Sequence, residues 1–222
     1  MSDKKDINQL TWNEHIRKRP AMYLSQVNVN GFVYMLKGII NSAILSADSS
    51  KFIIELKGKS EGIIKFNNRK GEVENNWGQF KPNPQNHFVL ELYALNALSK
   101  KFQMTFKDSN NEKIEEITFE EGYLQSGRYL ESIIYSQIEI KFTLDEDIWV
   151  TDFMWNKIYI THQIREYAYL QKKTKFEINY KEDDDNCKIF YHFKNGLKDR
   201  IDIEIISGLG GSYFEKTIDK SL

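Results

Sequence analysis

The chain has one cysteine, Cys187, in 222 residues. A single thiol excludes a disulfide framework and a metal site built from several thiolates within one chain. Proline is scarce, with 3 residues, while aromatic residues make up 14% of the sequence, and this composition argues against intrinsic disorder. The longest apolar runs are too short to span a bilayer, and the N-terminus lacks the apolar core of a signal peptide. We therefore expect a cytoplasmic protein that does not enter a membrane.

The chain also lacks a surplus of charge, because 31 basic and 32 acidic residues give a net charge of -1. The total charge therefore gives no support for direct DNA binding, although a local basic patch remains compatible with it. The four histidines show no metal-binding spacing. The length suits one domain with a sizeable core, which we place at residues 1–206. Residues 207–222, with Gly208, Gly210 and Gly211, have the composition of a flexible tail.

Periodicity along the chain predicts alternating helices and strands. Residues 31–47 carry apolar side chains at i, i+3, i+4 and i+7, which is the stripe of an amphipathic helix. The pattern predicts an α+β fold, a two-layer sandwich with helices on one face of a mixed sheet. Strand order does not follow from the sequence. The other expected elements are helices at 88–101 and 158–172, strands at 51–57, 62–66, 102–107, 113–119 and 133–144, an irregular loop at 72–86, and a hairpin formed by 175–180 and 188–193.

The most informative segment is His15-Ile16-Arg17-Lys18-Arg19-Pro20-Ala21-Met22-Tyr23-Leu24. It resembles the "V-R-K-R-P-G-M-Y-I-G" signature near the start of the ATPase domain of gyrase B and topoisomerase IV B, which belongs to the GHKL superfamily. Further segments fit the same register in the same order. They are Leu95-Asn96-Ala97-Leu98-Ser99, Ile140-Lys141-Phe142 with Asp145, the run from Ile164 to Lys173, and Phe193-Lys194-Asn195-Gly196-Leu197.

The resemblance implies where catalytic residues would stand on the helix at 31–47. The family keeps a glutamate as general base and, one turn later, an asparagine that binds Mg²⁺. These positions hold Lys37 and Asn41 here. A protonated lysine cannot accept a proton from water unless its pKa falls far below the usual value. We therefore assign no catalytic residue, and we take Asn41 as the candidate ligand of a metal and a nucleotide.

The resemblance also places the phosphate and adenine contacts. The family's adenine-binding motif aligns with Asn67-Asn68-Arg69-Lys70-Gly71, so Asn67, Lys70 and Gly71 are candidate nucleotide contacts, although we favour a plain turn between strands for this segment. The glycines of the family's lid align with Val89, Leu90 and Glu91. Those glycines expose backbone N–H groups to phosphate at a helix N-terminus, whereas Glu91 would bring negative charge there. The glycine of a later "T-G-T" motif is replaced by Gln137.

These losses predict a gyrase-B-like domain that no longer hydrolyses ATP and acts as a binding or regulatory module. It would have no cofactor, or ATP and Mg²⁺ if part of the site works. The partner would be a second copy or a topoisomerase B-type protein. One alternative is a divergent ATPase with a relocated base, such as Glu91 or Glu74. Another is an accessory factor associated with DNA.

Overall fold

The computed structural model describes residues 10–70, 72–74, 90–127, 132–150, 153–181 and 186–201, with the backbone alone described at 72–74 and 132–134. The expected tail at 207–222, the candidate contact Gly71 and most of the expected loop at 72–86 therefore lie outside the described residues. The remaining predictions can be compared with the structure element by element.

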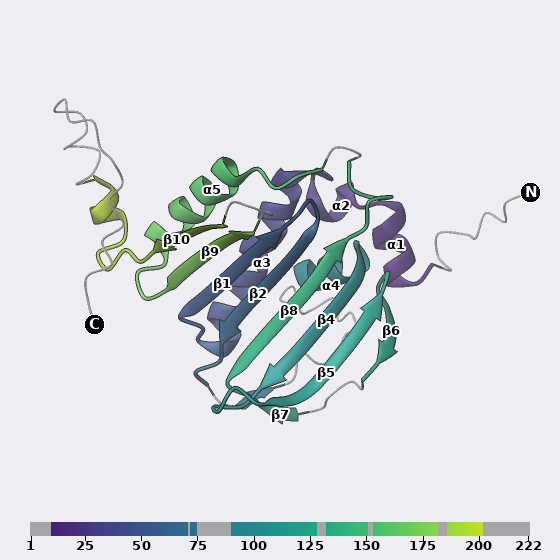
Figure 1. Ribbon diagram of the computed structural model, residues 1–222, viewed down its shortest axis with the longest axis horizontal. Helices are drawn as coiled ribbons and strands as arrows, with labels where there is room; N and C mark the ends of the chain where they lie inside the picture. Colours follow the sequence, from purple (N-terminus) through teal and green to yellow (C-terminus); the bar gives the residue numbers. More distant parts are fainter. Residues whose placement is uncertain are drawn as a thin grey trace, which may run out of the picture.

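The sheet forms one layer of the molecule (Figure 1). Its eight strands run in the order β10-β9-β1-β2-β8-β4-β5-β6. β1 and β9 are parallel, whereas the other neighbours are antiparallel, so the sheet is mixed as expected. A two-stranded sheet pairs β3 with β7. The strands are β1 (Lys51–Lys57), β2 (Glu61–Asn67), β3 (Glu72–Glu74), β4 (Ser99–Lys107), β5 (Lys113–Glu120), β6 (Tyr123–Ser126), β7 (Ser132–Ile134), β8 (Gln137–Leu144), β9 (Lys175–Lys181) and β10 (Asn186–Tyr191).

The helices form the second layer and cover one face of the sheet (Figure 1). The long helix α3 lies between α4 and α5 and packs against both. Asn28 caps its N-terminus, because its side-chain oxygen accepts hydrogen bonds from two backbone N–H groups of the first turn. The helices are α1 (Trp12–Lys18), α2 (Ala21–Leu24), α3 (Val29–Ala47), α4 (Leu90–Ala97) and α5 (Lys157–Leu170).

The core lies between the two layers. Residues alternate along the strands, so that one side chain points toward the helices and the next points toward solvent. The inward set is strongly aromatic, and Phe52 stacks on Phe176 with ring centroids 5.6 Å apart. On the helix side, the ring of Phe32 in α3 packs against that of Trp155, with centroids 4.8 Å apart. Both layers therefore depend on the same apolar contacts, and the predicted fold class is confirmed.

Residues 72–74 of the expected irregular loop form the strand β3, which pairs with β7, and two other expected boundaries are wrong. The helix expected at 88–101 ends at Ala97, and the strand begins at Ser99. The Ser99 hydroxyl donates to the carbonyl of Leu95, which satisfies one carbonyl at the end of the helix. The strand expected at 133–144 is divided between β7 and β8 by residues 135–136. At this division the N–H of Ser136 donates to the carbonyl of Lys107.

Within the part of the chain that the structure describes, no helix is long and apolar enough to cross a membrane. The same residues bring together no group of three or more histidine, cysteine, aspartate or glutamate side chains that could hold a metal ion.

Candidate functional site

The signature segment builds the first corner of the molecule through Arg17. Its guanidinium donates to the carbonyl of Ala97 at 2.9 Å and to the carboxylate of Asp145 at 2.5 Å. Asp145 is 3% exposed. Arg17 thereby ties α1 to the end of α4 and to the end of β8, because a buried carboxylate must be paired to remain charged. Arg17, a residue of the segment that resembles the family signature, therefore has an architectural role.

The same segment fixes the short helix α2 against α1. His15 Nδ1 lies 2.7 Å from the hydroxyl of Tyr23, and the two rings meet edge to face. Trp12 also meets the Tyr23 ring edge to face, with centroids 6.4 Å apart. Burial raises the pKa of Tyr23. These contacts are local, and they place the chain at the start of α3.

Helix α3 contacts α5 on one side and α4 on another. Lys37 and Asn41, the positions that the resemblance assigns to the site, lie on the side that faces α5. The ammonium of Lys37 donates to the side-chain oxygen of Gln163 at 2.7 Å. Burial lowers the pKa of Lys37, and the carboxylate of Glu166 opposes part of this shift. One turn later, the amide oxygen of Asn41 accepts a hydrogen bond from the hydroxyl of Tyr167 at 3.4 Å. Lys37 and Asn41 thus link α3 to α5.

The side of α3 that faces α4 carries Gly38. A Cβ atom at this glycine would stand 2.4 Å from Cγ and 2.8 Å from Oε1 of Glu91. The Glu91 side chain therefore rests on the bare backbone of α3, in a space that only a glycine leaves open. Sequence reasoning placed Glu91 at a lid glycine but missed Gly38, although a glycine inside a helical stripe is itself a signal of close approach.

The candidate nucleotide contacts at the end of β2 and in the following turn, Asn67 and Lys70, form hydrogen bonds to backbone groups. The amide oxygen of Asn67 accepts from the N–H groups of Ser50 at 3.0 Å and Lys51 at 2.8 Å, so this side chain joins β2 to the start of β1. The ammonium of Lys70 donates to the carbonyl of Leu45 at 2.9 Å, near the C-terminus of α3. Cations are favourable at that end of a helix. Asn67 and Lys70 thus lie at the end of β2 and in the turn after it, and Lys70 reaches the end of α3, whereas Asn41 is bonded to Tyr167 of α5.

The neighbouring Asn68 was not selected from the sequence, although it is buried. Its amide donates to the carbonyl of Tyr135 at 3.0 Å, and its oxygen accepts from the N–H of Lys70 at 3.0 Å. Asn68 therefore connects the end of β2 to the segment that leads into β8. No sequence signal separated it from Asn67, because the two adjacent asparagines differ only in the direction of their side chains.

Large apolar side chains of β2, β4 and β8 are buried beneath the helical layer. Phe66, Phe106 and Ile138 are at most 1% exposed. Tyr135 is also buried, and the centroids of its ring and the Phe106 ring are 5.2 Å apart. Its hydroxyl has no hydrogen-bond partner among the described residues, and burial strongly raises the pKa of Tyr135. The sheet beneath the end of α3 therefore presents an aromatic, closely packed surface.

We compared the sequence and the fold of this chain with those of known proteins. No protein-family model matches the chain. The DNA gyrase B protein of Spiroplasma citri is 23% identical over 214 residues, which covers 85% of this chain and 33% of that protein. Among solved structures, the 43K ATPase domain of Thermus thermophilus gyrase B, in complex with an aminocoumarin, matches with a TM-score of 0.68 at 20% identity. That match covers 96% of this chain and 59% of the other.

The eight-stranded mixed sheet and the single helical layer form an α+β sandwich, the fold class of the solved gyrase B ATPase domain. Within that class the chain has the fold of the gyrase B ATPase domain. It spans about a third of the length of the Spiroplasma citri relative. The resemblance inferred from residues 15–24 and the later segments is confirmed at the level of the fold.

Proposed function

We propose that this chain is a gyrase-B-like domain that does not hydrolyse ATP and that acts by binding another protein. One observation carries this proposal. The position of α3 that the resemblance matches to the family's catalytic glutamate is Lys37, which has no carboxylate. Since general-base assistance contributes about 10²–10⁴-fold to a rate, its loss alone would make hydrolysis slow.

The surroundings of Gly38 support the same conclusion. The carboxylate of Glu91 rests on this glycine, at the junction of α3 with the first turn of α4. The N-terminus of a helix favours anions, and here a side chain of the protein already supplies one. A phosphate group approaching this junction would meet a like charge. Magnesium would have Asn41 as a neutral ligand but would find no carboxylate at position 37.

The adenine contact is also weakened. The oxygen of Asn67 already accepts two backbone hydrogen bonds, which leaves its amide group for any base. That amide lies 3.4 Å from the hydroxyl of Ser50. The residues present therefore do not fit ATP with Mg²⁺. Asn41, Asn67 and Lys70 have structural partners that account for them without a nucleotide.

The identity of the partner is also part of this proposal, and it is based on the name of the matching protein. Because the matching protein is a DNA gyrase B protein, we propose a topoisomerase B-type protein or a second copy of this chain as the partner. A domain that keeps the fold but not the chemistry can still present the surfaces by which such proteins recognise one another.

Isothermal titration of the full chain with a non-hydrolysable ATP analogue and Mg²⁺ tests the loss of nucleotide binding. We expect no heat of binding at analogue concentrations up to about 1 mM, which corresponds to a binding free energy weaker than about -4 kcal/mol. The Glu91→Gly variant is the informative comparison, because it removes the carboxylate and restores a lid glycine. Micromolar binding by the unmodified chain would overturn the proposal.

A divergent ATPase remains the second candidate, favoured by the position of Glu91 against α3. If this carboxylate served as a relocated base, steady-state phosphate release would exceed background and Glu91→Gln would abolish it. Asn41→Ala should abolish it as well, because Asn41 is the candidate metal ligand. Release that persists in Glu91→Gln would exclude Glu91 as the base. The side chain of Glu74, the other candidate, lies outside the described residues.

A further inference from the structure

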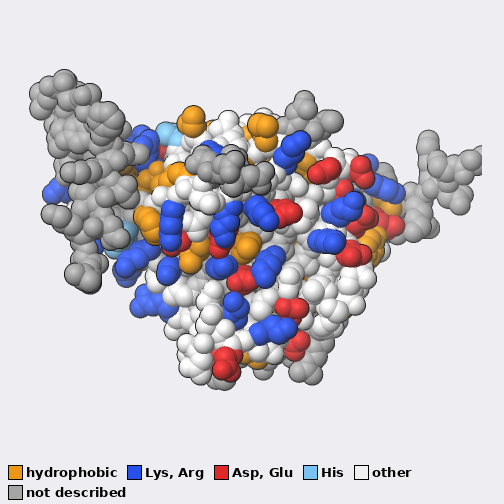
Figure 2. Space-filling model, viewed as in Figure 1, with side chains coloured by type: hydrophobic (Ala, Val, Ile, Leu, Met, Phe, Trp, Pro, Cys, Tyr) orange, Lys and Arg blue, Asp and Glu red, His pale blue; other side chains and the backbone are white. Residues whose placement is uncertain are grey.

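The face of the sheet opposite the helices carries a lattice of charged residues, which Figure 2 shows from the front. Strand register determines its members, because alternate residues point to this open face. Lysines outnumber glutamates there, although the chain as a whole has a net charge of -1. The outward lysines are Lys51, Lys57, Lys65, Lys101, Lys107, Lys141, Lys175, Lys181 and Lys188, and the outward glutamates are Glu55, Glu61, Glu116, Glu120, Glu139 and Glu177.

The central carboxylate of this face lies beneath its lysines. Glu139 is 6% exposed, and its oxygens lie 3.0 Å from the ammonium of Lys141, 3.2 Å from that of Lys107 and 3.6 Å from that of Lys65. These contacts lower the pKa of Glu139 against the opposing effect of burial, so it remains charged at neutral pH. Three cations surround one anion, which leaves a local excess of positive charge.

A second buried carboxylate repeats the arrangement. Glu55 pairs with Lys181, and it also lies 2.9 Å from Lys65. The side chains of Lys141 and Lys181 are 47% and 53% exposed, whereas those of the two glutamates are 8% and 11% exposed. The carboxylates therefore lie at the level of the sheet and the ammonium groups extend outward. A partner would meet a more positive surface than the count of residues indicates.

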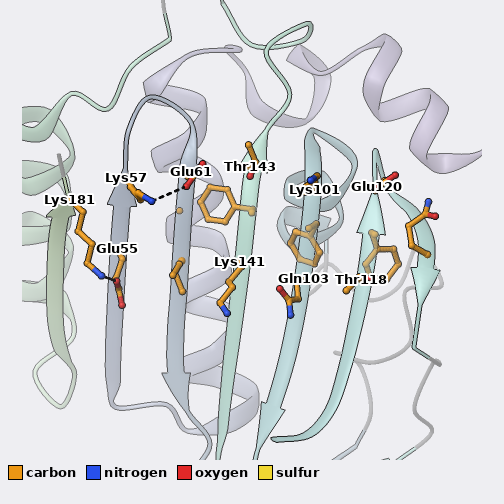
Figure 3. Close-up of a pocket in the computed structure, with 16 residues that line it drawn as sticks. Glu55, Lys57, Glu61, Lys101, Gln103, Thr118, Glu120, Lys141, Thr143 and Lys181 are labelled. Atoms are coloured by element: carbon orange, nitrogen blue, oxygen red, sulfur yellow. Dashed lines mark hydrogen bonds and ion pairs between the residues drawn. The ribbon is translucent and has the colours of Figure 1, made fainter. Parts of the chain in front are cut away.

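The same face is hollowed near the turn that joins β1 to β2 (Figure 3). A cavity of about 490 Å³ lies over β1, β2, β8, β4 and β5. Ile63 contributes an apolar side chain to its floor, and Gln103 and Thr118 contribute polar ones. Four lysines line it, namely Lys57, Lys101, Lys141 and Lys181. An apolar floor is thus combined in one open basin with a rim on which four lysines outnumber three glutamates.

We propose that this basin binds an acidic polypeptide segment of a partner protein, with an apolar side chain of the segment over Ile63 and its carboxylates beside the lysines. An apolar centre with a polar rim is the usual anatomy of a protein interface. The proposal deepens the binding role given above, because it names the surface and the chemistry of the partner. It is independent of whether nucleotide binds.

A protein partner is favoured over nucleic acid for two reasons. None of the described strands contains an arginine, the side chain best suited to bidentate contacts with phosphate. Exposed carboxylates also line the basin, since Glu61 and Glu120 stand among the lysines and would repel a phosphate backbone. A polypeptide can place an amide or a cation beside these groups, whereas a phosphate backbone cannot.

The test uses the full chain and two labelled peptides, one alternating glutamate with leucine and one alternating lysine with leucine. We expect fluorescence anisotropy to show binding of the acidic peptide alone, weaker at high salt. Lys101→Glu combined with Lys141→Glu should lower the affinity by about tenfold. Lys18→Glu, at an exposed position of α1 in the helical layer, is the matched control and should have no effect.

A second measurement locates the contact without any substitution. Addition of the acidic peptide to the isotope-labelled chain should shift the amide resonances of Ile63, Gln103 and Lys141. Shifts confined to the helical layer, equal binding of both peptides, or retention of a DNA duplex in place of the peptide would overturn the proposal. Binding of an ATP analogue in the same preparation would overturn the loss of nucleotide binding and leave this surface unaffected.

Discussion

The corner built by α1 and α2 and the junction of α3 with α4 both contain residues matched to the same family, but they differ in what those residues contact. At the corner, Arg17 pairs with a buried carboxylate and a helix-terminal carbonyl. At the junction, Glu91 rests on Gly38 where the family resemblance places a phosphate-binding turn. The segment that resembles the family most strongly is therefore architectural, so its presence reports the fold and says little about catalysis.

The comparison also concerns how buried carboxylates are held. Asp145 pairs with one guanidinium at 2.5 Å, with Glu121 as a further neighbour of Arg17 at 3.5 Å. Glu139 on the open face is shared among three lysines. A single partner makes each contact indispensable, whereas several partners make each one replaceable. Substitutions at the two places should therefore differ in size.

The largest effect is expected at the corner. Arg17→Ala leaves the carboxylate of Asp145 buried without its cationic partner, with only the N–H of Asp147, among the described residues, still bonded to it, and this should lower the free energy of unfolding by about 3–5 kcal/mol. Urea denaturation followed by circular dichroism measures it. Arg19→Ala, at an exposed position of the same signature, is the control and should change stability by less than about 0.5 kcal/mol. Equal losses in the two variants would contradict an architectural role specific to Arg17.

The next effect concerns the junction. Gly38→Ala places a methyl group 2.4 Å from Cγ of Glu91, and overpacking of this kind should lower stability by about 1–3 kcal/mol. Glu91→Ala removes the obstacle, so the double variant should recover most of the loss. A double-mutant cycle from thermal unfolding gives the coupling energy. Additive effects would show that Glu91 does not rest on Gly38.

A smaller effect is expected after β2. Asn67→Ala removes the acceptor of two backbone N–H groups, and the cost should be about 1–2 kcal/mol because the freed donors lie near solvent. Hydrogen exchange at the amides of Ser50 and Lys51 should become faster in this variant. Lys70→Ala, which removes one contact at the end of α3, serves for comparison. Unchanged exchange at both amides would contradict the assigned contacts.

The smallest effect is the pH dependence of the open face. The pKa values of Glu55 and Glu139 lie below that of an unfolded glutamate, so both groups contribute stability above a pH of about 4.5, which is lost as the pH falls through their folded pKa values. Glu139→Gln should therefore flatten the stability curve in acid. Lys141→Ala should cost at most about 1 kcal/mol at neutral pH, since Lys65 and Lys107 remain. Both curves follow from denaturation at a series of pH values.

Local pattern determined the longer elements and the fold class, whereas α1, α2, β3 and β6 were not predicted. The apolar stripe at 31–47 predicted α3 to within two residues, and alternation predicted β1 and β2 almost to the residue. The register of residues 15–24 indicated the GHKL fold. These predictions succeeded because periodicity and turn residues act over a few positions of the chain. At 97–99 the hydroxyl of Ser99 bonds back to the helix, and at 135–136 the N–H of Ser136 donates to Lys107 of the neighbouring strand β4.

The tertiary structure alone decided the rest. It paired β1 with β9 in parallel, turned Lys37 and Asn41 toward α5, seated Glu91 on Gly38 and gathered lysines from six strands on one face. Each of these facts depends on residues far apart in the sequence. A residue type in one segment carries no record of which distant side chain it will meet, because that meeting is set by how the two layers pack.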